Sequence, residues 1–153
     1  MRGEENHKVT KTQRGTEVTD GTGKVGEAGF EAEDPLSNRI IGAAISVHKA
    51  LGPGLLESVY HECIQIEFAT LGIPYRTEVL TPIVYRGRTL KSVYRIDLLV
   101  DDLVIVELKA VDALLPVHDA QLLTYLRITN KRVGLLLNFK APQLRNGTRR
   151  LVL

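Results

Sequence analysis

The spacing of hydrophobic residues changes several times along the chain, and each change marks a predicted element. After Asp34, apolar residues recur at the spacing of one helix face, at Ile40, Ile41, Ala44, Ile45 and Val47. Pro35 and Ser37 supply the residue types that start helices. The Gly- and Pro-containing run 51–54 ends this helix, and 55–71 is predicted as a second one.

The pattern becomes extended after residue 74 and returns once to a helix. β-Branched and aromatic residues predict strands at 79–85, 90–100 and 103–110, with turns at 86–88 and at Asp101-Asp102. An amphipathic helix at 117–129 and an apolar strand at 132–139 follow, and the tail 149–153 could add an edge strand. The order predicts a mixed α/β fold with one core.

Composition separates the first 34 residues from the rest. They carry 5 basic and 8 acidic side chains, whereas residues 35–153 carry 15 and 10. They also lack Leu and Ile, so they offer too little apolar surface to offset the entropy of ordering. We therefore expect a disordered leader at 1–34 and a folded domain at 35–153. A partner-binding tail is the alternative for the leader.

Cysteine usage and hydropathy bear on where the protein works. The single Cys63 excludes an internal disulfide and a cysteine-based zinc site. No apolar run reaches the roughly 18 residues of a membrane helix, and the first 15 residues lack the apolar segment of a signal peptide. We expect a cytoplasmic protein without a membrane partner.

Two charges interrupt the apolar run 103–110. Glu107 and Lys109 lie two apart and so share one face of a strand. Burying such charges is costly unless they are paired or bind a metal ion. Asp97 lies ten residues before Glu107, and these three residues form the main candidate site.

The turn between the two strands decides whether the carboxylates can act together. A two-residue turn would put Asp97 and Glu107 on opposite faces, because a slip of one residue reverses every side chain. A three-residue loop at 101–103 would put Val100 opposite Val104 and Asp97 opposite Glu107. We predict this loop and a shared metal ion, Mg²⁺ or Mn²⁺, which favour oxygen ligands.

A lysine beside such a site could orient a water molecule and stabilise charge on phosphorus, which is the role we expect for Lys109. A purely structural Asp, Glu and Lys network, or a solvated strand face, fits these three residues equally well.

Two helical pairs extend the candidate site. Gln121 and Tyr125 lie four apart and share a helix face, where they could brace the site or reach a nucleic-acid backbone. Glu57 and Tyr60 lie one turn apart near the start of the second predicted helix, and Glu57 could approach the metal ion. The alternatives are a first-turn acid that favours the helix dipole and tyrosines that pack in the core.

Together these residues resemble the GxxExxY protein family of the PD-(D/E)XK nuclease superfamily. The resemblance covers about residues 37–153 and is carried by GAAISVHKALGPGLLESVY at 42–60, YRIDLLVDDLVIVELKAV at 94–111, PVHDAQLLTYL at 116–126 and VGLLLNFK at 133–140. The superfamily motif, an acid followed by (D/E)xK, falls on Asp97, Glu107 and Lys109. The QxxxY element of RecB-like nucleases falls on Gln121 and Tyr125, and the GxxExxY motif spans 54–60.

The resemblance implies a restriction-endonuclease-like αβββαβ core in three layers and Mg²⁺-dependent hydrolysis of phosphodiester bonds. It implies that Asp97 and Glu107 ligate the metal ion, that Glu57 adds a metal or water contact, and that Lys109 positions the attacking water. Gln121 and Tyr125 would support the site or hold DNA. Ile96 stands where the superfamily motif nominally has proline.

Basic residues supply candidate contacts to a nucleic-acid partner, with DNA the expected one. They include Arg86, Arg88, Lys131 and Arg132, although charged loops are often merely solvated. The chain could also work as a homodimer or within a larger repair or defence complex. The sequence is therefore compatible with two functions. The first is a metal-dependent nuclease, and the second is an inactive module that keeps the fold and binds nucleic acid or protein.

Overall fold

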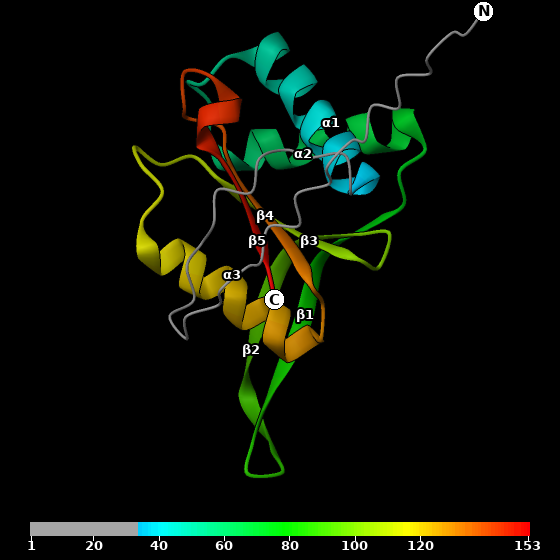
Figure 1. Ribbon diagram of the computed structural model, residues 1–153, viewed down its shortest axis with the longest axis vertical. Coiled ribbons are helices and arrows are strands. Elements are labelled where there is room, and N and C mark those ends of the chain that lie inside the picture. The colour runs from blue at the N-terminus through cyan, green and yellow to red at the C-terminus, as the bar shows by residue number, and fades with distance from the viewer. Residues whose placement is uncertain (1–33) are drawn as a thin grey trace, which may run out of the picture.

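The computed structural model describes residues 34–153. The elements are α1 (Pro35–Leu51), α2 (Glu57–Leu71), β1 (Tyr75–Tyr85), β2 (Arg88–Val100), β3 (Val104–Lys109), α3 (Pro116–Thr129), β4 (Val133–Asn138), the 3-10 turn η1 (Leu144–Gly147) and β5 (Thr148–Val152) (Figure 1). The expected leader lies outside the described residues, apart from Asp34. No helix within residues 34–153 is both long enough and apolar enough to cross a membrane.

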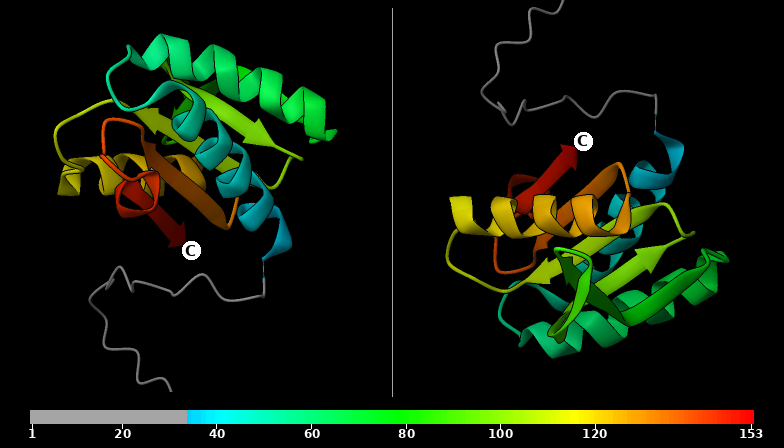
Figure 2. Two further views of the ribbon diagram at one scale, coloured as in Figure 1. Left: turned by 90° about the horizontal axis from the view of Figure 1, so that it is seen from above. Right: turned by 90° about the horizontal axis from the view of Figure 1, so that it is seen from below.

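The five strands form one mixed sheet in sequential order, β1-β2-β3-β4-β5. β3 and β4 are parallel and are joined through α3, whereas the other neighbours are antiparallel. Helices α1 and α2 cover one face and α3 covers the other (Figure 2). These features confirm the predicted three-layer, restriction-endonuclease-like fold, with β5 as the additional edge strand.

The buried residues divide between the two faces of the sheet. α1 and α2 pack against Val104, Val106 and Leu108 of β3, whereas α3 packs against Ile105 of the same strand. Because side chains alternate along a strand, Glu107 and Lys109 face the α3 layer. The central strand thus supplies apolar residues to both cores and charged residues to one face.

Capping residues fix where α1 begins. Asp34 caps the helix, because its Oδ1 accepts the Ser37 N–H at 3.1 Å and the Ser37 hydroxyl donates to its other oxygen. The same carboxylate forms an ion pair with Arg150 of β5 at 3.0 Å. Asp34, the last residue of the expected leader, is therefore joined to the fold.

A tyrosine fixes where α2 begins. The Tyr60 hydroxyl donates to the Gly52 carbonyl and accepts the Leu55 N–H at 3.1 Å. Its ring is fully buried and stacks on Phe139, with the ring centroids 4.5 Å apart. These bonds hold the residues after α1 as a loop, so α2 starts at Glu57, two residues later than predicted.

The β1–β2 hairpin projects beyond the rest of the domain (Figure 1). Its turn is Arg86-Gly87, with Tyr85 paired to Arg88. Both turn residues have positive φ, 49° and 74°, the backbone that a two-residue I′ turn requires. We call residues 79–96 the arm.

Gly134 of β4 lies in close contact with the α3 layer. A Cβ atom there would lie 2.8–2.9 Å from three side-chain carbons of Leu122. Leu122 is fully buried on α3. Glycine therefore sets the spacing between this helix and the sheet.

Candidate active site

The β2–β3 connection has the predicted three-residue loop, 101–103. Val100 pairs with Val104 and Leu98 with Val106. The backbone pairing ends there, so Asp97 and Glu107 are the next residues on the two strands. The predicted three-residue loop, with Val100 opposite Val104, is confirmed.

Where the backbone hydrogen bonds between β2 and β3 end, hydrogen bonds from backbone N–H groups to the two carboxylates take their place. After the Leu98–Val106 pair, the Asp97 N–H donates to Glu107 Oε1 at 3.1 Å and the Leu108 N–H donates to Asp97 Oδ2 at 2.9 Å. Each acid thus uses one oxygen to hold the opposite strand. The second oxygen of each remains to accept a proton or a cation.

Burial makes this pair of acids electrostatically costly. Glu107 is only 4% exposed. That burial, and then the negative charge of Asp97, raise the pKa of Glu107 to about 8, against the opposing effects of the Asp97 N–H and Lys109. At neutral pH the metal-free site therefore retains a proton on the carboxylate pair.

A chain of hydrogen bonds connects Lys109 to α3. Lys109 Nζ donates to Gln121 Oε1 at 3.3 Å, and Gln121 Nε2 donates to the Tyr125 hydroxyl at 2.9 Å. Burial and the charge of Glu107 raise the pKa of Tyr125 to about 12, so its hydroxyl stays protonated. The structure thus brings Glu107, Lys109, Gln121 and Tyr125 together.

Glu57 approaches the same acids from α2. A cleft of about 350 Å³ is lined by Glu57, Ser58, His61, Glu62, Glu78 and Asp97. Partial burial and the negative charge of Asp97 raise the pKa of Glu57, while Lys109 and His61 oppose the shift. Tyr60, its partner in the sequence motif, instead lies in the core and holds the preceding loop.

Three further residues shape the site and were missed in the sequence. His61 Nε2 lies 3.3 Å from the Asp97 carbonyl and Gln65 hydrogen-bonds its Nδ1, so the ring braces the strand at Asp97. Glu78 enters the cleft from β1 with a positive φ of 48°. The sequence offered a clue to His61, which lies one helical turn after Glu57, but none to Glu78.

Asn138, the third, is the β4 partner of Lys109 and is 3% exposed. Its side chain accepts from the Val111 N–H at 3.1 Å and donates to the Val111 carbonyl at 2.9 Å. It fixes the chain just after Lys109. Asn138 could have been identified from the sequence as a polar residue in an apolar strand, in the same way as Glu107.

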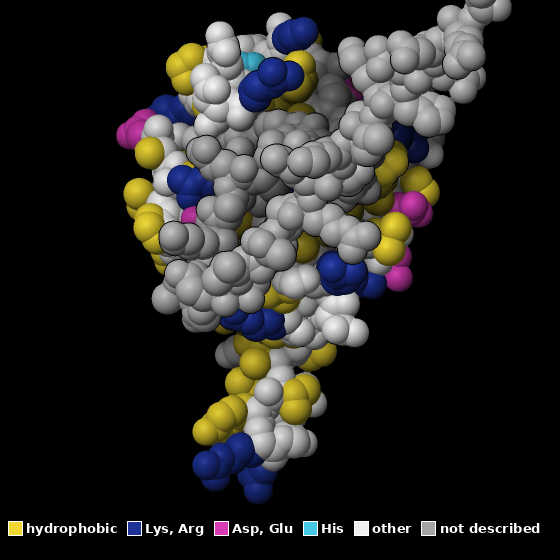
Figure 3. Space-filling view, in the orientation of Figure 1, with side chains coloured by type: hydrophobic (Ala, Val, Ile, Leu, Met, Phe, Trp, Pro, Cys, Tyr) yellow, Lys and Arg dark blue, Asp and Glu magenta, His cyan; other side chains and the backbone are white. Residues whose placement is uncertain are grey.

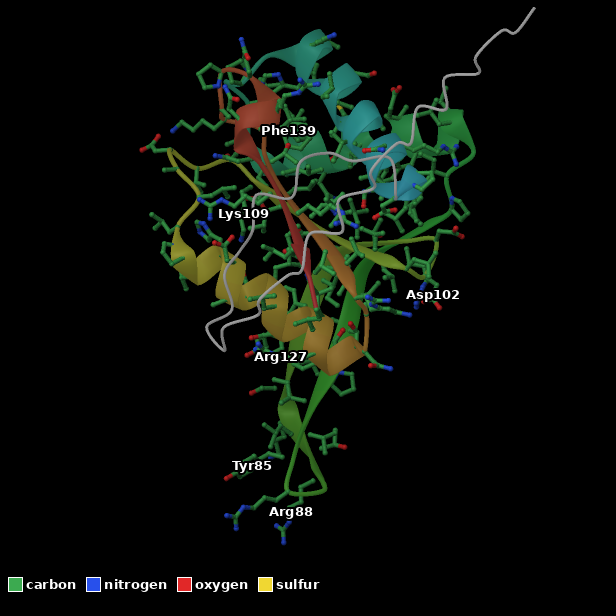
Figure 4. The ribbon with its side chains drawn as sticks, in the orientation of Figure 1. Tyr85, Arg88, Asp102, Lys109, Arg127 and Phe139 are labelled. Carbon is green, nitrogen blue, oxygen red and sulfur yellow. The ribbon has the colours of Figure 1, made fainter. Side chains whose placement is uncertain are left out.

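The four predicted basic contacts lie away from the carboxylates. Arg86 and Arg88 are at the arm tip. Lys131 and Arg132 precede Val133, which pairs with Val104 at the start of β3, and Lys131 Nζ contacts Asp102 at 3.4 Å. Asp102 and Lys109 are well separated in Figure 4.

The donor set fits a hard divalent cation. Within residues 34–153, no group of three or more His, Cys, Asp and Glu side chains is arranged to hold a metal ion. Mg²⁺, however, is commonly held by one or two carboxylates, with water and substrate phosphate completing its shell. Asp97 and Glu107 each have an oxygen left for this role, and a cation would relieve the repulsion that raises the Glu107 pKa.

Comparison with known proteins agrees with this geometry. Neither curated proteins nor solved structures yield a significant match. The sequence profile of the PD-(D/E)XK nuclease superfamily matches residues 34–151, a span that holds every residue of the site. The matched span includes Asp97, Glu107 and Lys109, and this chain belongs to the PD-(D/E)XK nuclease superfamily.

Proposed function

We propose that this protein is a metal-dependent nuclease of the GxxExxY type that hydrolyses phosphodiester bonds, with DNA as its substrate. One observation carries the proposal: two carboxylates meet across a strand pair beside a lysine that is held by Gln121. A buried arrangement of like charges is costly to keep without a cation.

Each residue has a distinct part in the proposed reaction. Asp97 and Glu107 would hold Mg²⁺ or Mn²⁺ through their remaining oxygens, and Glu57 would contact the ion or its water from the cleft. The ion would supply a Lewis acid for the phosphate. Lys109, oriented by Gln121, would position the attacking water and stabilise the developing negative charge.

The first experiment compares cleavage of single- and double-stranded DNA and RNA in Mg²⁺, Mn²⁺ or EDTA. Asp97→Asn and Glu107→Gln keep the shape of each side chain and remove its charge. We expect both to lose cleavage by at least about 100-fold, since each removes a metal ligand. Asp101→Asn, in the exposed loop of the same hairpin, is the matched control and should retain activity.

Lys109→Ala separates water positioning from metal binding. Its cleavage rate should fall by about 10²–10⁴-fold, the usual worth of a positioned catalytic group, while Mn²⁺ affinity falls only a few-fold. An equal loss of metal affinity would make Lys109 structural. Wild-type cleavage in Glu107→Gln would refute the metal assignment, and absence of metal binding to the wild type would favour the inactive module.

A further inference from the structure

The arm concentrates positive charge. Residues 79–96 include Arg86, Arg88, Lys91 and Arg95 but no Asp or Glu. Arg95 pairs with Glu78 at 3.8 Å, and within residues 34–153 no carboxylate lies within 4 Å of the other three. Figure 3 shows basic side chains gathered at the arm tip. This charge is available to an anionic partner.

Beyond its base, where Thr81 and Ile96 are buried, the arm exposes both of its faces. Beyond Pro82 it is a two-stranded ribbon with no helix against it (Figure 1). Its exposed apolar side chains include Leu80 at 59%, Val84 at 62% and Val93 at 48%. Isolated two-stranded ribbons are marginally stable in water, so a partner that covers the arm would stabilise it.

The base of the arm adjoins the candidate active site. Val79 pairs with Ile96, and the residues just beyond them, Glu78 and Asp97, line the cleft. Arg88 lies nine positions before Asp97 along β2, which gives a reach of roughly 30 Å. That length is close to one turn of duplex DNA, about 34 Å. Figure 4 shows Tyr85 and Arg88 at the far end from Lys109.

We propose that the arm enters the major groove of double-stranded DNA and so gives the site a preference for duplex substrate. This inference rests on the proposed nuclease function. The major groove of B-form DNA admits a two-stranded ribbon, whereas that of A-form RNA is too narrow and deep for side chains to read. The arm's cations face phosphates, and its apolar side chains lie against the groove.

Other occupants fit the arm less well. Binding of single strands relies on several aromatic platforms, but Tyr94 of the arm packs on Tyr125, with the ring centroids 5.3 Å apart, which leaves Tyr85. The arm of a second copy would bring equal positive charges together, and like charges face to face are unfavourable.

The test uses matched double variants of the full chain. Arg86→Asn/Arg88→Gln removes two charges at the tip, with Asn chosen because it adopts positive φ readily. Lys49→Gln/Arg145→Gln removes two exposed charges on α1 and η1. Equal thermal melting of all three proteins establishes that the fold is kept. Binding to a labelled duplex of about two helical turns, and to one of its strands, is followed by fluorescence anisotropy in EDTA over a salt series.

We expect the tip variant to bind duplex DNA about tenfold or more weakly than the wild type. The slope of log binding constant against log salt concentration should become shallower by up to about 1.8, because two charges are removed. Binding of single strands should stay within about twofold of the wild type. The control variant should bind both the duplex and the single strand as the wild type does. Equal loss on single strands, or unchanged duplex binding, overturns the inference. A changed sedimentation coefficient with unchanged duplex binding would instead assign the arm to a protein interface.

The EDTA condition separates this inference from the nuclease proposal. Duplex binding that depends on the tip, without cleavage in any metal, would uphold the arm and refute the nuclease. Metal-dependent cleavage with a tip that does not affect duplex binding would uphold the nuclease and refute the arm.

Discussion

The two acids at the centre of the site each hold the strand that carries the other. Asp97 accepts from the backbone after Glu107, and Glu107 accepts from the backbone of Asp97. The sequence revealed the charged residues, because charge inside an apolar strand is conspicuous, and it yielded their alignment through the loop length. The reciprocal backbone bonds were not predictable, since they depend on where the two strands separate.

Metal binding at this pair should depend on pH. The Glu107 pKa is raised to about 8, so below that pH a proton must leave before the ion binds. Affinity for Mn²⁺ should therefore rise about tenfold per pH unit from pH 6 to 8, with about one proton released, and then level off. Calorimetry in two buffers with different ionisation enthalpies measures both quantities.

Asp101→Asn is the control for this titration and should show the same pH dependence as the wild type. Glu107→Gln should bind weakly and without the rise. An affinity that stays constant between pH 6 and 8 in the wild type would contradict the assignment of the proton to the carboxylate pair.

At the level of elements, prediction failed where a side chain or a distant strand decides a boundary. α2 begins late because Tyr60 bonds the loop before it, and no local pattern indicates such a bond. β1 begins at Tyr75, four residues earlier than predicted, because Tyr75 pairs with Val100. The 101–103 loop was predictable because only a loop of odd length puts Asp97 and Glu107 on the same face of the sheet, where they can bind one metal ion.

Tyr60→Phe tests the loop before α2. It removes two hydrogen bonds but keeps the stacked ring, so the free energy of unfolding should fall by about 1–3 kcal/mol. Urea denaturation measures the change. Tyr75→Phe is the matched control, because within residues 34–153 the Tyr75 hydroxyl has no hydrogen-bond partner, and it should change stability by less than about 0.5 kcal/mol.

Asp34→Ala tests the start of α1. It removes the helix cap and leaves Arg150 without its carboxylate, so we expect a loss of about 1–3 kcal/mol in unfolding free energy. Asp112→Ala removes an exposed partner of Lys140, and such pairs contribute about 0–1 kcal/mol. Equal melting temperatures for the two variants would show that Asp34 does not anchor the helix.

Across the whole molecule, the site draws on both layers around the sheet. α2 brings Glu57 and His61 to the cleft, while α3 brings Gln121 and Tyr125 to Lys109. Periodicity predicts each helix and which residues share its face, but not the layer in which the helix lies, so the sequence could suggest this convergence only as one of several readings. The basic residues of the arm were visible in the sequence, but the projection of the arm beyond the domain was not, because its apolar residues are typical of an ordinary strand.

Local stability should differ sharply between the sheet centre and the arm. β3 and β4 are buried on both faces, whereas residues 84–94 are exposed. Hydrogen exchange followed by mass spectrometry should show amides of the arm exchanging at least about 100-fold faster than those of β3. Similar protection in both regions would mean that the arm is covered in the free protein.

The close contact between Gly134 and Leu122 has a consequence for how such a domain can evolve. Any larger residue at 134 pushes on α3 at the position next to Gln121, and therefore on the amide that orients Lys109. A smaller residue at 122 would make room for it and return the helix to its place. These two positions should change together in descendants that keep Gln121 in contact with Lys109, so paired substitutions in the core would record selection on the candidate site.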